Sequence, residues 1–189
     1  MPVAIAKCAL NGGPHCGDEG AYWQTGSTTT LCIADGLGHG EQAEKAAHAA
    51  VGYVADHLSE PLPAIFAGCD SAIRRSRGVA MGIAVIDEEA RTLTYAGIGN
   101  TRAMIAGARS GGLVSDPGIV GGGYKTLAPE TMPLASGDLV IMSTDGVEEV
   151  IDMSRYQGAL RTDLRRLAEQ ILQDWRTETD DAAVLVFRS

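Results

Sequence analysis

The stretch TLCIADGLGHG, residues 30–40, joins an apolar run to a carboxylate, a glycine-rich turn and the beginning of a helical pattern. Its first five residues have the composition of a buried strand, and Asp35 ends that strand. Gly36 allows close approach of the backbone, so its carbonyl can face a ligand together with the Asp35 carboxylate. Apolar residues then recur at helical spacing over residues 39–58. The stretch therefore predicts a carboxylate held rigidly between a buried strand and a helix.

Three further acidic points lie elsewhere in the chain, at Asp18, at Asp145 and at the pair Asp180-Asp181. Asp145 follows an apolar run, and the pair precedes another. A single Asp-Gly dipeptide most often forms a turn, but acids repeated at the ends of core strands repel one another unless a positive charge lies between them. Hard divalent cations prefer carboxylate and carbonyl oxygens. The pattern therefore favours a site in which Asp35 bridges two cations about 3.5–4 Å apart.

The rest of the sequence predicts many strands and a few helices. Besides the helix at 39–58, apolar spacing predicts helices at 61–73 and 160–175 and a short helical turn at 147–151. Strands are predicted at 2–10, 20–34, 78–86, 92–98, 101–105, 138–143 and 182–188. The glycine-rich stretch 107–123 is interpreted as turns and a mobile loop, because it lacks the ending of a phosphate-binding loop. This order predicts an α+β fold in which two packed sheets carry helix pairs on their outer faces.

Size and composition indicate one globular domain over residues 1–189, and a monomer is favoured. The net charge of −9 argues against nucleic acid as a partner. The N-terminus lacks a signal-peptide pattern and no apolar run is long enough to span a membrane, so we expect a cytoplasmic protein. The four cysteines show no zinc-site spacing and are expected to be reduced thiols. The basic cluster at residues 74–77 is interpreted as a solvated helix end.

Five motifs occur in a specific order and spacing. They are Gly17-Asp18, ADGLGHG at 34–40, Gly97-Ile98-Gly99-Asn100, Ser143-Thr144-Asp145-Gly146 and DDAAV at 180–184. Together they resemble the metal-dependent serine/threonine phosphatases of the protein phosphatase 2C (PPM) class, in particular the bacterial SpoIIE/RsbU branch. The resemblance spans essentially the whole chain. It implies a four-layer α-β-β-α sandwich of two mainly antiparallel sheets, with the metals in a cleft at one edge of both sheets.

The resemblance also implies a role for several residues in these five motifs. Asp35 would bridge two divalent cations, Mn²⁺ or Mg²⁺. Asp18 and the Gly36 carbonyl would complete the shell of one cation, and Asp145 and Asp180 would hold the other. A ligand set of oxygens alone, without imidazole or thiolate, agrees with these hard metals.

Some positions depart from the family pattern. Leu37 stands where eukaryotic relatives have a histidine assigned as general acid, and His39, two residues later, is either a catalytic acid or a helix-capping or packing residue. Asn100 stands where those relatives have an acid, which favours a structural role in its turn. The segment 14–16 lacks their phosphate-holding arginine, so phosphate is expected to rest on metals and water. Asp181 is expected to support the metal ligands or to replace one of them.

These features predict a phosphatase in which metal-bound water attacks the phosphorus of phosphoserine or phosphothreonine. The resemblance implies phosphorylated stressosome proteins of the STAS type as partners, and a role in resetting bacterial stress signalling. Two alternatives stay open. One is a non-catalytic interaction protein on the same fold, and the other is a phosphatase of a different phosphoprotein or of a small phosphoester. A cysteine phosphatase is disfavoured, because no Cys-x5-Arg loop follows Cys16.

Overall fold

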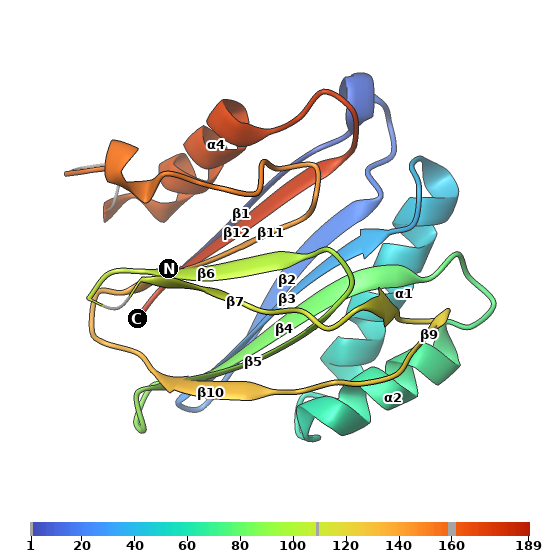
Figure 1. Ribbon diagram of the computed structural model, residues 1–189, viewed down its shortest axis with the longest axis horizontal. Coiled ribbons are helices and arrows are strands. Elements are labelled where there is room, and N and C mark those ends of the chain that lie inside the picture. The colour runs from blue at the N-terminus through green and yellow to red at the C-terminus, as the bar shows by residue number, and fades with distance from the viewer. Residues whose placement is uncertain (1, 109, 159–161) are drawn as a thin grey trace.

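Two five-stranded sheets form the centre of the computed structural model, which describes residues 2–108, 110–158 and 162–189 (Figure 1). Sheet I has the order β10 (Glu130–Pro133), β5 (Thr92–Ile98), β4 (Val79–Asp87), β3 (Thr28–Gly36) and β2 (Asp18–Thr25). Sheet II has the order β1 (Val3–Cys8), β12 (Ala182–Arg188), β11 (Leu139–Ser143), β6 (Arg102–Ala106) and β7 (Gly111–Leu113). Neighbouring strands in both sheets run antiparallel.

Helices cover the outer face of each sheet. Sheet I carries α1 (Glu41–Asp56) and α2 (Leu62–Ala72), while sheet II carries α4 (Leu164–Trp175) and the one-turn helix η2 (Met153–Arg155) (Figure 1). The predicted four-layer α-β-β-α sandwich is confirmed. None of the helices within the described residues has the length and apolar character that crossing a membrane requires.

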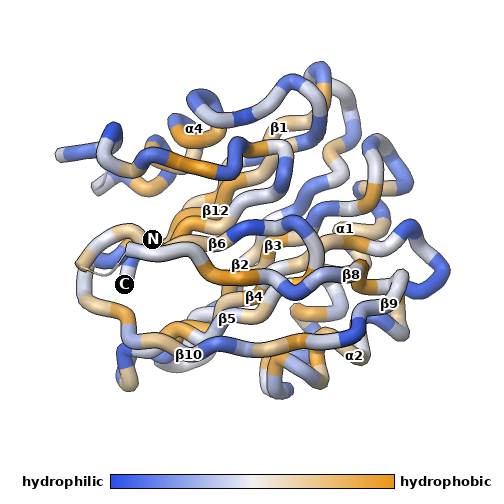
Figure 2. Tube along the Cα trace, in the orientation of Figure 1, coloured by the Kyte–Doolittle hydropathy of each residue, from blue (hydrophilic) through white to orange (hydrophobic). Residues whose placement is uncertain are grey.

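Three apolar layers fill the spaces between the four structural layers. In β3, Leu31 and Ile33 pack between the sheets, whereas Cys32 and Ala34 pack against the helices. The strand β12 alternates in the same way between the inter-sheet layer and α4. Side chains that point alternately to two buried faces explain why both strands read as continuous apolar runs. Figure 2 shows this apolar character along the strands.

The predicted strand over residues 20–34 is wrong, because the structure divides it into the hairpin of β2 and β3. Thr25 pairs with Thr28 across a two-residue turn at 26–27, in which Gly26 has φ 60°. Glycine adopts this positive φ without steric cost, and two-residue turns of this kind match the twist of antiparallel strands. The hairpin places Asp18 at the first residue of β2, directly opposite Asp35.

Two further expectations need correction. Residues 147–151 form no helical turn: Val147 bridges to Arg176, and the Glu148 N–H donates to the Trp175 carbonyl at 2.8 Å. These bonds to the chain after α4 take the place of helical bonds. The glycine-rich stretch is not simply a mobile loop, since β7 joins sheet II and β8 (Gly118–Ile119) pairs with β9 (Gly123–Tyr124). The predicted third helix begins at Leu164, and its expected start near residue 160 lies outside the described residues.

Candidate metal and active site

Strand ends from both sheets meet at one edge of the sandwich. Asp35 lies near the end of β3, Asp145 follows β11 and Asp180 precedes β12. These three side chains line one open cleft of about 440 Å³. The other lining residues are uncharged and mostly small or apolar: Leu37, Gly38, Ala80, Gly99, Asn100, Pro117, Gly118 and Ile119. The fold therefore brings three of the predicted metal ligands to one surface.

Asp18 lies beside Asp35 but is far more buried. The two residues are cross-strand partners in β2 and β3, and Asp18 is only 2% exposed. Its Oδ2 atom has no hydrogen-bond partner among the described residues. Buried polar atoms in native proteins are nearly always paired, so a buried carboxylate oxygen of this kind marks a position where a cation fits.

Proximity and burial together shift the pKa values of these carboxyl groups. Burial raises the pKa of Asp18 to about 7; a hydrogen bond with Thr144 opposes the shift, and the charge of Asp181 adds to it. Burial, followed by the charges of Asp18 and Asp145, raises the pKa of Asp35 to about 9. Burial also raises the pKa of Asp180. Without a cation, Asp18, Asp35 and Asp180 are therefore more easily protonated than ordinary aspartates.

The donor set fits hard divalent cations. Among the described residues, no three carboxylate, imidazole or thiolate side chains lie close enough to enclose an ion by themselves. An ion at the cleft would complete its shell with backbone carbonyls and water, as Mg²⁺ commonly does. Such ions prefer oxygen ligands. The carboxylates that line the cleft and the unpartnered Asp18 Oδ2 atom behind it supply them here.

The two Asp-Gly dipeptides of the site differ in local structure. Asp35 and Gly36 are the last two residues of β3, so the turn alternative considered for this dipeptide is wrong. A Cβ on Gly36 would lie 2.1 Å from the Ala43 carbonyl oxygen of α1, which only glycine avoids. Gly146, in contrast, follows Asp145 in a turn, and a Cβ there would lie 1.8 Å from the Asp181 carbonyl oxygen. Both glycines allow a backbone contact behind a carboxylate of the cleft.

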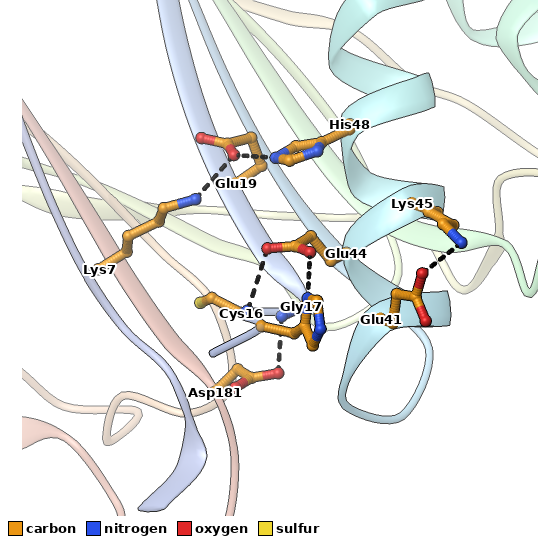
Figure 3. Close-up of polar contacts among 10 residues, drawn as sticks. Lys7, Cys16, Gly17, Glu19, Glu41, Glu44, Lys45, His48 and Asp181 are labelled. Atoms are coloured by element: carbon orange, nitrogen blue, oxygen red, sulfur yellow. Dashed lines mark hydrogen bonds and ion pairs between the residues drawn. The ribbon is translucent and has the colours of Figure 1, made fainter. Parts of the chain in front are cut away.

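Asp181 points away from the cleft and organises the backbone behind it. Its Oδ1 accepts a hydrogen bond from the Leu10 N–H at 2.7 Å, and its Oδ2 accepts one from the Gly17 N–H at 2.7 Å (Figure 3). The Gly17 carbonyl in turn accepts a bond from the Gly36 N–H at 3.0 Å. Asp181 thus connects β12 to the segments that carry Asp18 and Asp35.

Ion pairs also fix the start of β2 next to Asp18 (Figure 3). Glu19 contacts Lys7 of β1 at 2.8 Å and His48 of α1 at 2.7 Å. Glu44 of α1 contacts His15 at 2.7 Å and accepts a longer bond from the Cys16 N–H at 3.4 Å. These pairs join β1, β2 and α1 around the chain segment that leads to Asp18.

His39 and Asn100 take positions that the sequence left undecided. The helix α1 begins at Glu41 with Gly40 as its N-cap, and His39 is exposed, so His39 neither caps nor packs. His39 directly follows Gly38, which lines the cleft. Asn100 donates from Nδ2 to Asp145 Oδ2 at 2.5 Å, so its role extends beyond its own turn.

Neither Cys16 nor Cys69 provides a nucleophile for cysteine-phosphatase chemistry. All four are free thiols, as expected. Cys16 is buried, and burial raises its pKa to about 11. Cys69 and Arg75 do have the Cys-x5-Arg spacing, but Cys69 lies inside α2, where burial raises its pKa to about 12. A thiol, unlike a thiolate, is a poor nucleophile, which excludes these residues from cysteine-phosphatase chemistry.

Sequence reasoning missed two contacts that shape the cleft. Arg77, assigned to a solvated helix end, donates to the Leu37 carbonyl at 3.4 Å. Asp70 of α2 accepts bonds from the N–H groups of Gly121 and Gly123. Both contacts join residues more than 35 positions apart, and no local pattern marks them. Only the Gly121-Gly122-Gly123 run signalled a segment that needs a special backbone conformation.

Comparisons with known proteins agree with this geometry. The sequence model of the SpoIIE family (stage II sporulation protein E) matches residues 25–189. The chain is 28% identical over 135 residues to the phosphoserine phosphatase RsbX of Bacillus subtilis strain 168, which covers 70% of this chain and 67% of RsbX.

Solved structures show the same fold. A structure from work on the bacterial stressosome as a modular system superposes with a TM-score of 0.94 and 27% identity, covering 99% of this chain and 98% of that chain. RsbX in complex with magnesium superposes with a TM-score of 0.81 and 23% identity, covering 99% and 94% of the two chains. Since the SpoIIE sequence model matches most of the chain and the fold agrees, this protein belongs to the SpoIIE family of PP2C-type phosphatases.

Proposed function

We propose that this protein is a divalent-cation-dependent phosphatase that hydrolyses phosphoserine or phosphothreonine in other proteins. One observation carries the proposal: Asp35, Asp145 and Asp180 gather at an open cleft, beside the buried and unpartnered oxygen of Asp18. Membership in the SpoIIE family and the likeness to phosphoserine phosphatase RsbX support the same reaction class. The presence of all four carboxylates opposes a purely binding role on this fold.

Each carboxylate has a proposed role in holding two cations, Mg²⁺ or Mn²⁺. Asp35 would hold both ions, Asp18 and the Gly36 carbonyl would be further ligands of one, and Asp145 and Asp180 would hold the other. When bound, such cations supply Lewis acidity, which lowers the pKa of water and neutralises phosphoryl oxygens. The likeness to RsbX in complex with magnesium supports a divalent cation at this site.

Other residues of the chain orient the ligands and handle a proton. Asn100 fixes one oxygen of Asp145, so that the second oxygen can face the cleft. Asp181 holds the backbone on which Asp18 stands. His39 is exposed and directly follows Gly38 of the cleft lining, and we assign it as the donor of the proton that the leaving serine oxygen needs.

The shape of the cleft favours a protein substrate. The cleft is open, and its described lining residues include neither an aromatic side chain that would stack on a base nor a cation that would hold a free phosphate. Glycine and alanine at four lining positions allow a folded partner to approach closely. The likeness to a stressosome structure and to RsbX favours phosphorylated stressosome proteins of the STAS type as partners, with dephosphorylation resetting the signal.

Phosphate release tests this function. The substrates are an aryl phosphate and a panel of phosphorylated STAS-type proteins, each with Mg²⁺, with Mn²⁺ and with excess chelator. We expect hydrolysis of both substrate classes that stops in excess chelator. Full activity in chelator would refute the cation requirement. Hydrolysis of the aryl phosphate without any phosphoprotein would refute the substrate class alone.

A further inference from the structure

A contact of α2 fixes the glycine-rich segment next to the cleft. Asp70 Oδ1 accepts hydrogen bonds from the Gly121 N–H at 2.8 Å and from the Gly123 N–H at 3.2 Å. The Asp70 side chain is 17% exposed and both bonds are charge-assisted; the bond from Gly121 is partly buried and the bond from Gly123 is exposed. One carboxylate oxygen thus holds two backbone positions of the turn that joins β8 to β9.

The same segment is fixed from the side of sheet I. Val120 is fully buried and exchanges two hydrogen bonds with Val79, the first residue of β4, both at 2.9 Å. Gly121 has φ 89°, and a Cβ there would lie 2.8 Å from a side-chain carbon of Ile73 at the end of α2. The segment therefore passes between β4 and α2, and its path requires glycine.

The other side of this segment faces the carboxylates. Pro117, Gly118 and Ile119 line the cleft together with Asp35, Asp145 and Asp180. Residues 117–119, here called the glycine wall, have no charged side chain. Only Val120 separates the glycine wall from the first of the two residues that Asp70 holds. Gly123, the second residue that Asp70 holds, pairs directly with Ile119 of the wall in the β8–β9 ribbon, so loss of the Asp70 bonds acts on the wall through this pairing.

We propose that Asp70 is a positioning residue that holds the glycine wall where it contacts the polypeptide flanking the phosphorylated residue. The inference rests on the proposed function and adds a determinant of protein-substrate binding. Asp70 does not line the cleft and takes no part in the chemistry. Its effect is confined to substrates large enough to touch the wall.

The ion pair of Asp70 offers a way to separate this role from helix stability. Arg74 Nη2 lies 3.6 Å from Asp70 Oδ2, one helical turn away, and the Arg74 side chain is 70% exposed. Exposed pairs of this kind contribute little to stability. Removing Arg74 leaves both glycine N–H bonds in place, so an Arg74 variant serves as the matched control.

Steady-state kinetics of the full chain with saturating Mg²⁺ tests the proposal on a phosphoserine protein and on an aryl phosphate. We expect Asp70→Ala to raise KM for the phosphoprotein about tenfold, as loss of roughly one to two net hydrogen bonds predicts. Its kcat/KM for the aryl phosphate stays at the wild-type value. Asp70→Asn, which keeps an acceptor oxygen, restores most of the phosphoprotein KM, and Arg74→Ala matches the wild type on both substrates.

Other outcomes separate the possible failures. Equal losses on both substrates in Asp70→Ala, or an unchanged phosphoprotein KM, would overturn the positioning role. If Asp70→Ala does not fold, Asp70→Ser keeps a polar side chain but withdraws the oxygen from both glycines, and the same KM rise is expected. If the wild type hydrolyses neither substrate, the proposed function fails. If it hydrolyses both and no Asp70 variant alters KM, only this inference fails.

Discussion

The two walls of the cleft are held in different ways. The carboxylate wall, made by Asp35, Asp145 and Asp180, stands at the ends of strands whose side chains fill all three apolar layers. The glycine wall at residues 117–119 depends on a short ribbon, one pair of bonds to Val79 and the two bonds to Asp70. Catalytic groups need rigid elements to hold their positions, whereas a segment that only contacts the substrate can be held by fewer bonds. The comparison predicts that changes in the carboxylate wall affect every substrate and changes in the glycine wall affect only protein substrates.

The largest effect is expected from Asp35→Asn in the carboxylate wall. Loss of the bridging carboxylate removes several kcal/mol of charge stabilisation by the cations, and kcat/KM falls roughly 10³-fold on the aryl phosphate and on the phosphoprotein alike. The variant should fold, since asparagine has nearly the shape of aspartate and is neutral, like the protonated Asp35 carboxyl of the metal-free protein. Phosphate release with saturating Mn²⁺ measures the effect. Activity close to the wild type would refute the bridging role.

A smaller and more selective effect is expected from His39→Ala. A general acid contributes about 10²-fold or more to a step whose leaving group needs a proton. The serine oxygen needs that proton, while an aryl oxide leaves without it. We therefore expect a large fall in kcat for the phosphoserine protein and little change for p-nitrophenyl phosphate. Equal values of kcat for variant and wild type on the phosphoprotein would remove His39 from the reaction.

The carboxylate wall also predicts an unusual pH dependence of stability. The pKa values of about 7 for Asp18 and about 9 for Asp35 lie above the ordinary value of 3.8, so the folded metal-free protein holds protons that the unfolded chain releases. This contribution is fully present below the unfolded pKa and is lost as the pH rises through the folded values. The free energy of unfolding in urea should therefore fall between pH 5 and pH 9 without metal. Saturating Mg²⁺ should abolish the fall, because the cation favours the ionised carboxylates.

The smallest effect is expected in the glycine wall, from Gly118→Ala. Gly118 has φ 147°, and a Cβ there would lie 2.4 Å from the Tyr124 Cβ, so the β8–β9 ribbon must shift. Local strain of roughly 1–3 kcal/mol should raise the phosphoprotein KM severalfold and spare the aryl phosphate. Gly52→Ala is the matched control, because a Cβ at Gly52 in α1 would meet no atom within 4 Å. A fall in aryl phosphate turnover in Gly118→Ala would show that the two walls are not independent.

The sequence predicted the carboxylate wall better than the glycine wall. Apolar runs before Asp35 and Asp145 and after Asp181 are local signals, and their register follows from the alternation of buried side chains. The contact between Asp70 and Gly121 joins distant segments and depends on how α2 packs, which no local pattern encodes. The turn at residues 26–27 was missed because β-branched threonines, Thr25 before it and Thr28, Thr29 and Thr30 after it, favour strand on both sides of Gly26-Ser27. Residues 147–151 were misread because their backbone bonds go to the chain after α4.

The central claim is that Asp35 and its neighbours bind the divalent cations that the reaction uses. Isothermal titration calorimetry of the wild type and of Asp35→Asn with Mn²⁺ and Mg²⁺, at pH 7 and in two buffers of different ionisation enthalpy, tests it most directly. We expect the wild type to bind the cation and to release protons, because the raised pKa of Asp35 keeps that carboxyl protonated in the metal-free protein. Asp35→Asn should lose both the binding and the proton release. Equal cation binding by the two proteins, or none by the wild type, would contradict the account.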